Sequence, residues 1–141
     1  MTKTVESLFS LKDKVIVVTG ATGVLGEAFI NGLHAAQATI IIIGRNEEVA
    51  KLRAESVNNN GGKAIYIIAD VLNEQDLLEA NSHIIKTYGR IDALVNGAGG
   101  NIPEAVIQSG SDVFDININA LKQAFDLNLF GTIIPTQIFG K

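Results

Sequence analysis

The chain has 141 residues, of which 47% are hydrophobic, carries a formal net charge of −4 at pH 7 and contains no cysteine. These values suit one domain with a packed core, and the lack of cysteine excludes a disulfide framework, a thiolate zinc site and a cysteine nucleophile. The acidic balance without a basic run argues against a nucleic-acid partner. Residues 38–43, the densest hydrophobic run, are too few to span a bilayer, and residues 1–13 lack a signal peptide's hydrophobic segment, so we expect a cytoplasmic protein without a membrane partner.

The first unit that the sequence pattern predicts is a strand, a glycine turn and a helix. Residues 15–19 are hydrophobic and β-branched, Gly20, Gly23 and Gly26 follow at regular spacing, and hydrophobic residues then recur at helical steps to Ala36. This arrangement directs free backbone N–H groups at a pyrophosphate. Because turns use glycine anyway, a purely structural turn at the helix start is the alternative. The legible strand and helix on either side favour dinucleotide binding.

Strand and helix patterns alternate along the rest of the chain. We expect strands at residues 39–43, 63–68 and 91–95, helices at 47–57 and 73–89, an irregular segment at 100–117 and a long helix at 120–139. Such alternation predicts an α/β fold with a doubly wound parallel sheet of the Rossmann type and right-handed crossovers. Because that fold has two halves, residues 1–141 are expected to form one NAD(P)-binding domain that holds the first half only.

Residues at the ends of the second and third strands are candidate ligand contacts. Asp70 follows the third strand, where parallel sheets bind ligands, although it could be only a loop or capping aspartate. NAD-binding units usually carry an acidic residue after the second strand, but this chain has Arg45 and Asn46 there. Because an arginine suits a 2′-phosphate, NADP(H) is favoured, with NAD(H) possible. Alternatively, Arg45 is a surface residue paired with a glutamate, and Glu47 could still reach a ribose.

Two asparagines also have two interpretations each. Asn96, at the end of the fourth strand, could contact a ligand or brace neighbouring loops. Asn128, in the long helix, either braces a network of water and backbone groups or is merely structural. His34 and His83 lie on polar helix sides and are interpreted as solvated, and we expect no metal site.

Four separated motifs resemble those of the short-chain dehydrogenase/reductase family over essentially the whole chain. Thr-Gly-Ala-Thr-Gly-Val-Leu-Gly at residues 19–26 resembles the nucleotide-binding turn, and Ala-Asp-Val-Leu at 69–72 resembles the segment whose aspartate contacts adenine. Asn-Gly-Ala-Gly at 96–99 resembles the element after the fourth strand. Phe-Asp-Leu-Asn-Leu-Phe-Gly at 125–131 resembles the helix segment whose asparagine organises a catalytic relay.

Pattern and resemblance together assign the site residues. The resemblance makes Asn128 the catalytic residue. The expected cofactor contacts are Gly20, Thr22, Gly23, Val24, Leu25, Gly26, Arg45, Asn46, Asp70, Val71, Asn96, Ala98 and Gly99.

Two positions depart from the family's pattern. Val24 stands where the single-domain branch usually has glycine, and the middle glycine lies one position earlier, at Gly23. That spacing resembles the extended, epimerase-type branch. Asp70, Val71 and the segment around Asn128 nevertheless favour the single-domain branch. Gly97 replaces the family's second asparagine, which removes a side-chain hydrogen-bonding group and should loosen that turn.

The resemblance implies an NAD(P)-dependent oxidoreductase that interconverts an alcohol and a carbonyl. The family's serine, and its tyrosine followed four residues later by lysine, lie after a fifth strand, and neither Tyr66 nor Tyr88 has a lysine at that spacing. We therefore expect a chain truncated before the catalytic Ser/Tyr/Lys region and inactive by itself. Residues 99–104 resemble members acting on sugar acids such as D-mannonate, fructuronate or gluconate. The alternative is a non-catalytic dinucleotide-binding module.

The long helix predicts an oligomer. It is hydrophobic nearly all round and so should be buried nearly all round, with a kink near Pro135. The side that carries Asn128 should face the site, and Leu127, Phe130 and Ile134 lie near one another on a different side. In the resembling family this helix pairs with its copy, so we expect a homo-oligomer, a dimer or tetramer, through residues 120–139. The competing interpretation is that the second half of the fold covers that surface.

Overall fold

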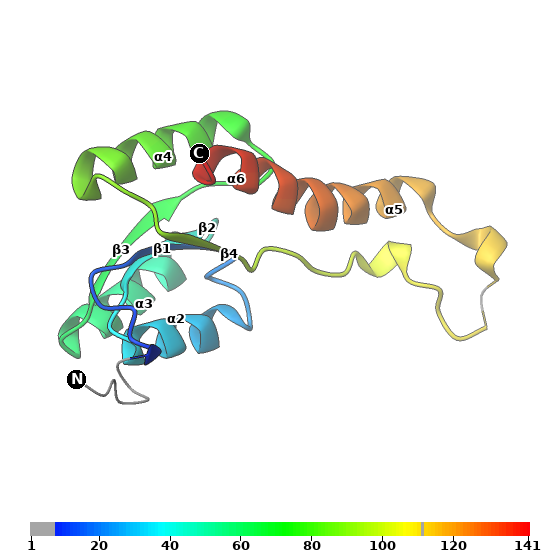
Figure 1. The fold of residues 1–141 in the computed structure, drawn as a ribbon. Coiled ribbons are helices and arrows are strands. Elements are labelled where there is room, and N and C mark those ends of the chain that lie inside the picture. Colours follow the sequence, from blue (N-terminus) through cyan, green and yellow to red (C-terminus); the bar gives the residue numbers. More distant parts are fainter. Residues whose placement is uncertain (1–7, 111) are drawn as a thin grey trace.

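The computed structural model describes residues 8–110 and 112–141. Four parallel strands form one sheet in the order β3-β2-β1-β4. They are β1 (Val15–Thr19), β2 (Thr39–Gly44), β3 (Lys63–Ile68) and β4 (Ala93–Asn96). Helices α4 (Glu74–Tyr88) and α6 (Gly131–Phe139) lie on one face of the sheet, and α2 (Gly26–Ala35) and α3 (Glu47–Asn59) lie on the other (Figure 1). The order matches the first four strands of a doubly wound fold, so the predicted fold class is confirmed.

The two central strands are hydrophobic throughout because helices cover both faces of the sheet. Every residue of β1 and β2 is buried. On one face Val18 and Ile42 pack into the cluster that includes residues of α2 and α3. On the other face Val17 and Ile41 pack with Leu77 of α4 and with residues of α6. Continuous hydrophobic runs are typical of such doubly covered parallel strands.

The observed elements lie close to the predicted ones. Strand β3 has its predicted bounds, and α4 begins after Asn73, whose side-chain oxygen accepts hydrogen bonds from two backbone N–H groups of the first turn. Helix α4 ends at Gly89, which has a left-handed φ of 75°. Strand β4 begins two residues later than predicted, at Ala93, because its ladder with β1 starts opposite Ile16. No helix among the described residues is long and hydrophobic enough to cross a membrane.

The predicted helix over residues 120–139 consists of three consecutive helical segments. They are α5 (Ile118–Phe125), the π-helical segment η3 (Asp126–Phe130) and α6. A kink was predicted near Pro135, and the departure from regular α-helix lies about one turn before it, in the π-helical segment η3. Pro135 itself is buried inside α6. The preceding segment is irregular as predicted and contains two short 3-10 turns, η1 (Pro103–Ala105) and η2 (Val113–Asp115). Figure 1 shows that this segment and α5 project together from the body of the molecule.

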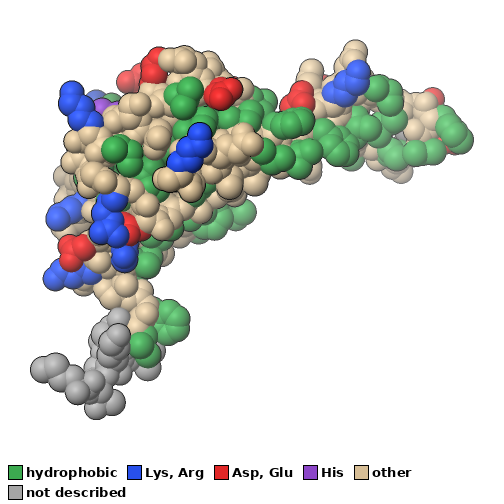
Figure 2. Space-filling view, turned by 45° about the horizontal axis from the view of Figure 1, so that its top comes forward, with side chains coloured by type: hydrophobic (Ala, Val, Ile, Leu, Met, Phe, Trp, Pro, Cys, Tyr) green, Lys and Arg blue, Asp and Glu red, His purple; other side chains and the backbone are tan. Residues whose placement is uncertain are grey.

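The three residues of the predicted subunit surface do not form one exposed face, and the oligomer itself stays a prediction. Ile134 packs against the core cluster beneath α4 and α6, Leu127 lines a cleft at the sheet, and both are partly buried, whereas Phe130 is exposed. Figure 2 shows hydrophobic side chains gathered along the projecting segment. Along α5, η3 and the first turn of α6, the exposed ones are Ile118, Phe125, Leu129, Phe130 and Ile133. The π-helical turn shifts the residues that follow it around the helix axis, which a regular helical spacing cannot anticipate.

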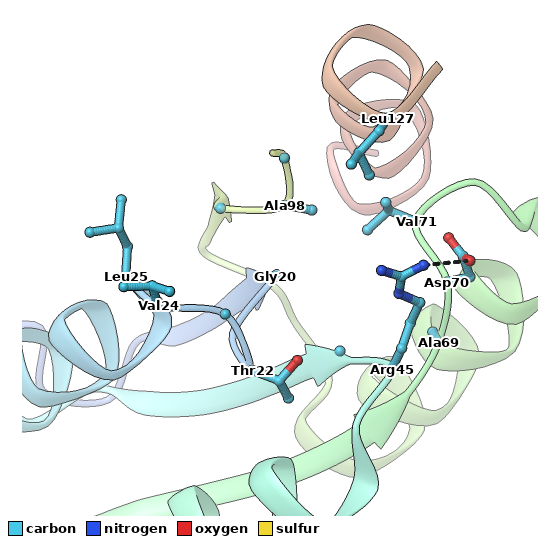
Figure 3. A pocket seen from close by; sticks show the side chains of 14 residues that line it. Gly20, Thr22, Val24, Leu25, Arg45, Ala69, Asp70, Val71, Ala98 and Leu127 are labelled. Atoms are coloured by element: carbon cyan, nitrogen blue, oxygen red, sulfur yellow. Dashed lines mark ion pairs between the residues drawn. The ribbon is translucent and has the colours of Figure 1, made fainter. Parts of the chain in front are cut away.

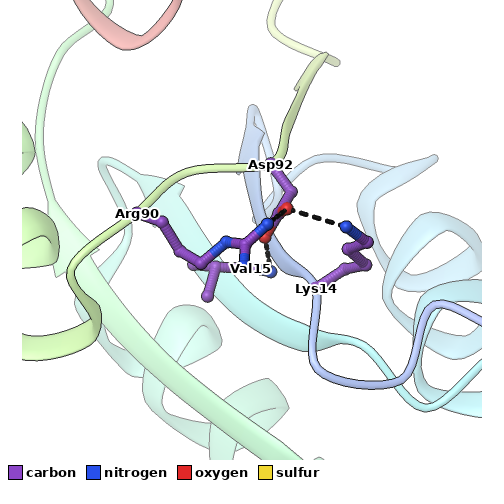
Figure 4. A network of polar contacts seen from close by, with 4 residues as sticks. All are labelled: Lys14, Val15, Arg90 and Asp92. Carbon is purple, nitrogen blue, oxygen red and sulfur yellow. Dashed lines mark hydrogen bonds and ion pairs between the residues drawn. The ribbon is translucent and has the colours of Figure 1, made fainter.

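A polar network ties β1 to β4 at the amino ends of the strands (Figure 4). One carboxylate oxygen of Asp92 accepts the backbone N–H of Val15 at 2.9 Å, and the other accepts Lys14 Nζ at 3.1 Å and the Arg90 guanidinium. The side chain of Asp92 is only 10% exposed. The hydrogen bond from Val15, helped by Lys14 and Arg90 and opposed by desolvation, lowers the pKa of Asp92 to about 2.

Asp92 should therefore contribute to the acid dependence of stability. A carboxylate whose pKa is about 2 in the folded chain and about 3.9 when unfolded stabilises the fold above pH 4 and loses that effect as the pH falls from about 4 to 2. We expect Asp92→Asn to be less stable than the wild type at pH 7, with the difference shrinking over this window. Urea unfolding followed by circular dichroism between pH 2 and 7 measures it. A constant difference across the window would contradict the assignment.

Gly26, the first residue of α2, is confined by the turn that precedes it. A Cβ at this position would collide with the backbone of Ala21, so the glycine makes room for the turn itself. The same helix contains Gly32, around which a Cβ would meet nothing within 4 Å. These two glycines in one helix form a matched pair for mutagenesis.

We expect Gly26→Val to lower the free energy of unfolding by about 1–3 kcal/mol, because the added side chain must displace backbone. Gly32→Val, in open space on the same helix, should change it by less than about 1 kcal/mol. Chemical denaturation of both variants measures the difference. Equal effects of the two substitutions would show that the contact with Ala21 is not limiting.

Candidate functional site

A cleft of about 310 Å³ opens at the carboxyl ends of the strands. It lies where the strand order reverses between β1 and β4, the position at which doubly wound sheets bind ligands. The turn after β1, the ends of β2 and β3, the loop after β4 and the segment η3 all contribute to it (Figure 3). Its lining residues are Gly20, Thr22, Gly23, Val24, Leu25, Gly44, Arg45, Ala69, Asp70, Val71, Gly97, Ala98, Gly99 and Leu127.

Most of the predicted cofactor contacts line this cleft, and three do not. Gly26 lies behind the turn, at the start of α2. Asn46 is the N-cap of α3, and its Oδ1 accepts the backbone N–H of Val49 at 3.1 Å. Asn96 braces α6, because its Nδ2 donates to Thr136 Oγ1 at 3.0 Å. Of the two interpretations of Asn96, the structure shows the bracing contact.

Four lining residues were not among the predicted contacts. Gly44 ends β2, and a Cβ there would lie 2.5 Å from the side-chain oxygen of Thr22. The absence of a side chain at Gly44 therefore leaves room for the side chain of Thr22. A Cβ at Gly97 would lie 2.7 Å from the carbonyl oxygen of Thr19. The expectation of a loosened turn at Gly97 is thus corrected, since the glycine permits close packing. Ala69 and Leu127 complete the set, and no local pattern marks either of them.

The turn after β1 is held against the loop after β4 by backbone contact. Gly20 has a φ of 62°, which glycine adopts without strain. A Cβ on Gly20 would lie 2.5 Å from backbone atoms of Gly97 and Ala98. The glycine therefore serves the predicted tight turn and also permits the two loops to meet at the cleft.

Three residues of this turn that line the cleft have backbone N–H groups without an acceptor among the described residues. Within the part of the chain that the structure describes, the N–H groups of Thr22, Val24 and Leu25 have no hydrogen-bond acceptor, and all three residues line the cleft. The neighbouring Gly23 N–H instead donates to the Gly20 carbonyl at 2.9 Å. Free N–H groups beside the N-terminus of a helix, here α2, attract anions through their partial positive charge. The geometry suits a phosphate or pyrophosphate group.

Arg45 and Asp70 form a solvent-exposed ion pair at the rim of the cleft (Figure 3). Arg45 Nη1 lies 3.8 Å from Asp70 Oδ2, and the two side chains are 74% and 39% exposed. The partner of Arg45 is therefore Asp70 and not a glutamate. Asp70 also caps its own loop, because its Oδ1 accepts the backbone N–H of Leu72 at 3.0 Å. An exposed pair at this distance is weak, so both side chains are free to turn toward a ligand.

Asn128 holds the loop that follows β4. Its Nδ2 donates to the carbonyl oxygens of Gly100 and Ala124, each at 2.8 Å, and its Oδ1 accepts the N–H of Gly100 at 3.1 Å. A Cβ on Gly99 would lie 2.9 Å from the same Oδ1, so the loop passes close to the asparagine. The Asn128 side chain thus braces backbone groups, as one of its two interpretations expected. Its catalytic role stays a prediction.

Two curated relatives are uncharacterized oxidoreductases. The first, from Haemophilus influenzae, is 34% identical over 142 residues, which cover 94% of this chain and 50% of the relative. UxuB of Bacillus subtilis is 31% identical over 140 residues, with 94% and 50% coverage. The chain thus spans about half the length of these relatives.

Solved structures share the fold. A Haemophilus protein with the provisional name D-mannonate oxidoreductase, crystallised with bound NAD, superposes with a TM-score of 0.87 at 31% identity over 97% of this chain and 52% of its own. A hydroxysteroid dehydrogenase from Escherichia coli superposes with a TM-score of 0.79 at 26% identity, over 93% and 52%.

The amino-acid sequence also matches the sequence model of a protein family. Residues 14–141 match the model described as short chain dehydrogenase, so nearly the whole of the described chain is covered. The glycine turn, the aspartate after β3, the loop after β4 and the asparagine of η3 all lie within the matched range. The chain belongs to the short-chain dehydrogenase/reductase family.

Proposed function

We propose that this protein is an NAD(P)-dependent oxidoreductase that interconverts an alcohol and a carbonyl. The observation that carries the proposal is the cleft at the switch point, where free N–H groups of the glycine turn form a site for a pyrophosphate. Asp70 and Val71 at the end of β3 would border the adenine, and the loop at Ala98 and Gly99 would border the remainder of the dinucleotide. The nicotinamide supplies the hydride chemistry, and the chain supplies binding and orientation.

We further propose a sugar acid such as D-mannonate as the substrate. Residues 99–104, which resemble family members acting on sugar acids, lie in the loop beside the cleft, and Gly99 and Gly100 of this loop contact Asn128. The provisional name of the Haemophilus protein supports the same class. The rival function is a non-catalytic dinucleotide-binding module.

The deciding experiment uses the protein expressed from its complete gene. Dinucleotide binding is titrated first, and turnover is then followed at 340 nm with D-mannonate and oxidised NAD or NADP. Binding with turnover supports the enzyme, and binding without turnover on any of a panel of sugar acids and simple alcohols favours the module. If the gene continues beyond Lys141, a serine followed by Tyr-x-x-x-Lys would support the enzyme. Residues 1–141 alone contain no such motif, so we expect them to show no turnover.

We propose that Arg45 favours NADP(H) over NAD(H). Its exposed guanidinium can leave Asp70 for a 2′-phosphate and form charge-assisted hydrogen bonds, each worth about 1.5–3 kcal/mol. The related Haemophilus crystal holds NAD, so the preference rests on Arg45 alone.

Arg45→Ala should therefore weaken NADP(H) binding by about tenfold or more, since about 1.4 kcal/mol is tenfold, and leave NAD(H) nearly unchanged. Calorimetric titration with both cofactors measures this. Lys51→Ala is the charge-matched control, because Lys51 pairs with Glu55 on α3 and does not line the cleft. Equal losses of affinity for both cofactors would contradict the assignment of Arg45 to the 2′-phosphate.

We also propose a homo-oligomer that buries the exposed hydrophobic side chains around Phe130. Phe125, Leu129, Phe130 and Ile133 are each exposed by 39% or more, and exposed hydrophobic clusters of this kind mark interfaces. The rival cover is a further part of the same polypeptide.

Phe130→Glu separates the two, because it places a charge in whichever dry contact exists. We expect a folded monomer that still binds the dinucleotide, seen by size-exclusion chromatography with light scattering. Gln123→Glu, on an exposed position of α5, is the control and should leave the assembly intact. An unchanged oligomer would rule the interface out, and an unfolded chain would indicate cover by the same polypeptide.

A further inference from the structure

Arg53 of α3 reaches across to the glycine turn after β1. Its Nη1 donates to the carbonyl oxygen of Ala21 and, at 3.0 Å, to that of Gly23. The two carbonyls come from alternate residues of the turn, so one guanidinium nitrogen holds both. Because Arg53 lies 32 residues after Ala21, no local pattern marks this contact.

These two hydrogen bonds, together with one from the Gly26 N–H to the Gly23 carbonyl at 3.2 Å, fix the direction of the neighbouring N–H groups. In a planar trans peptide the carbonyl of one residue and the N–H of the next point in opposite directions, and the described chain has no cis peptide bond. With the carbonyls of Ala21 and Gly23 directed at α3, the N–H groups of Thr22 and Val24 are directed away from it. Both residues line the cleft, and neither N–H has an acceptor among the residues described.

The charge of Arg53 adds to this effect. The guanidinium forms no ion pair with a carboxylate in the described ranges, in contrast to Arg45 and Arg90. It stands on the far side of the turn from the cleft and binds two carbonyl oxygens, whose partial negative charge would otherwise repel an anion. Hydrogen bonds from a charged donor are about twice as strong as neutral ones, so the turn is held firmly. Gly26 contributes as well, because a side chain there would displace the Ala21 carbonyl.

We propose that Arg53 is a positioning residue for the phosphates of the dinucleotide. By holding two carbonyls on the α3 side of the turn, it presents the N–H groups of Thr22 and Val24 to the pyrophosphate before the ligand arrives. The inference rests on the proposed dinucleotide binding and extends it to a residue outside the cleft lining. A residue that only joined α3 to the turn for stability would affect all ligands of the cleft alike.

The test compares a ligand with phosphates and a ligand without them. In the protein expressed from its complete gene, ADP and adenosine are titrated as competitors of NADH fluorescence, and NAD(H) is titrated directly. The variants are Arg53→Met, which keeps a long unbranched side chain without donors, and Arg53→Lys, which keeps the charge and one donor nitrogen on a shorter side chain. Lys51→Met, on the same helix and paired with Glu55, is the control.

We expect Arg53→Met to weaken ADP and NAD(H) by about tenfold, Arg53→Lys to weaken them less, and adenosine to change by less than about twofold. Lys51→Met should behave as the wild type. Unchanged ADP affinity in Arg53→Met, or equal losses for ADP and adenosine, would overturn the inference. If Arg53→Met does not fold, Arg53→Gln, which is polar but neutral and shorter, decides by the same ratio of ADP to adenosine, and an unchanged ratio overturns the inference. Wild-type protein that binds neither ADP nor NAD(H) would instead overturn the proposed function and this inference with it.

Discussion

The site depends on the close approach of the backbone at Gly20 to the backbone of Gly97 and Ala98. A single added carbon at Gly20 would lie 2.5 Å from atoms of both residues, so the contact exists only because both loops present bare backbone there. The left-handed φ of Gly20 turns the chain toward the β4 loop at the same point. Without this contact the two loops at the switch point would separate, and the cleft that the residues of the turn help to line would widen.

That contact is itself set by the register of β1 and β4. Thr19 pairs with Asn96, so the residues that follow them in sequence, Gly20 and Gly97, leave the sheet side by side. At the other end of the same two strands Asp92 binds the backbone N–H of Val15, immediately before the ladder begins opposite Ala93. A slip in register would break this charged contact and separate the two glycines together. The polar network and the cleft thus lie at opposite ends of the paired strands β1 and β4.

The sequence predicted what depends on neighbours along the chain. The bounds of β3 and α4, the Asn73 cap and the glycine turn after β1 all follow from local spacing and local hydrogen bonding. Contacts between distant residues were not predictable, because nothing in the sequence near Gly44 indicates the side chain of Thr22, and nothing near Arg53 indicates the carbonyls it binds. The π-helical turn was missed for another reason, since a change of hydrogen-bond partner leaves no mark in a hydrophobic pattern.

The segment that projects from the sheet connects assembly to the site. Leu127 of η3 lines the cleft, and Asn128 beside it holds the loop at Gly100, so one turn of helix positions two walls of the site. The same turn carries Leu129 and Phe130, which the described fold leaves exposed. A contact that covered those side chains, as in the proposed assembly, would also restrain the π-helical turn, because both sets of residues share one short stretch of backbone. For the proposed dinucleotide site and the proposed assembly, we therefore expect cofactor affinity and association to be coupled through the position of Leu127.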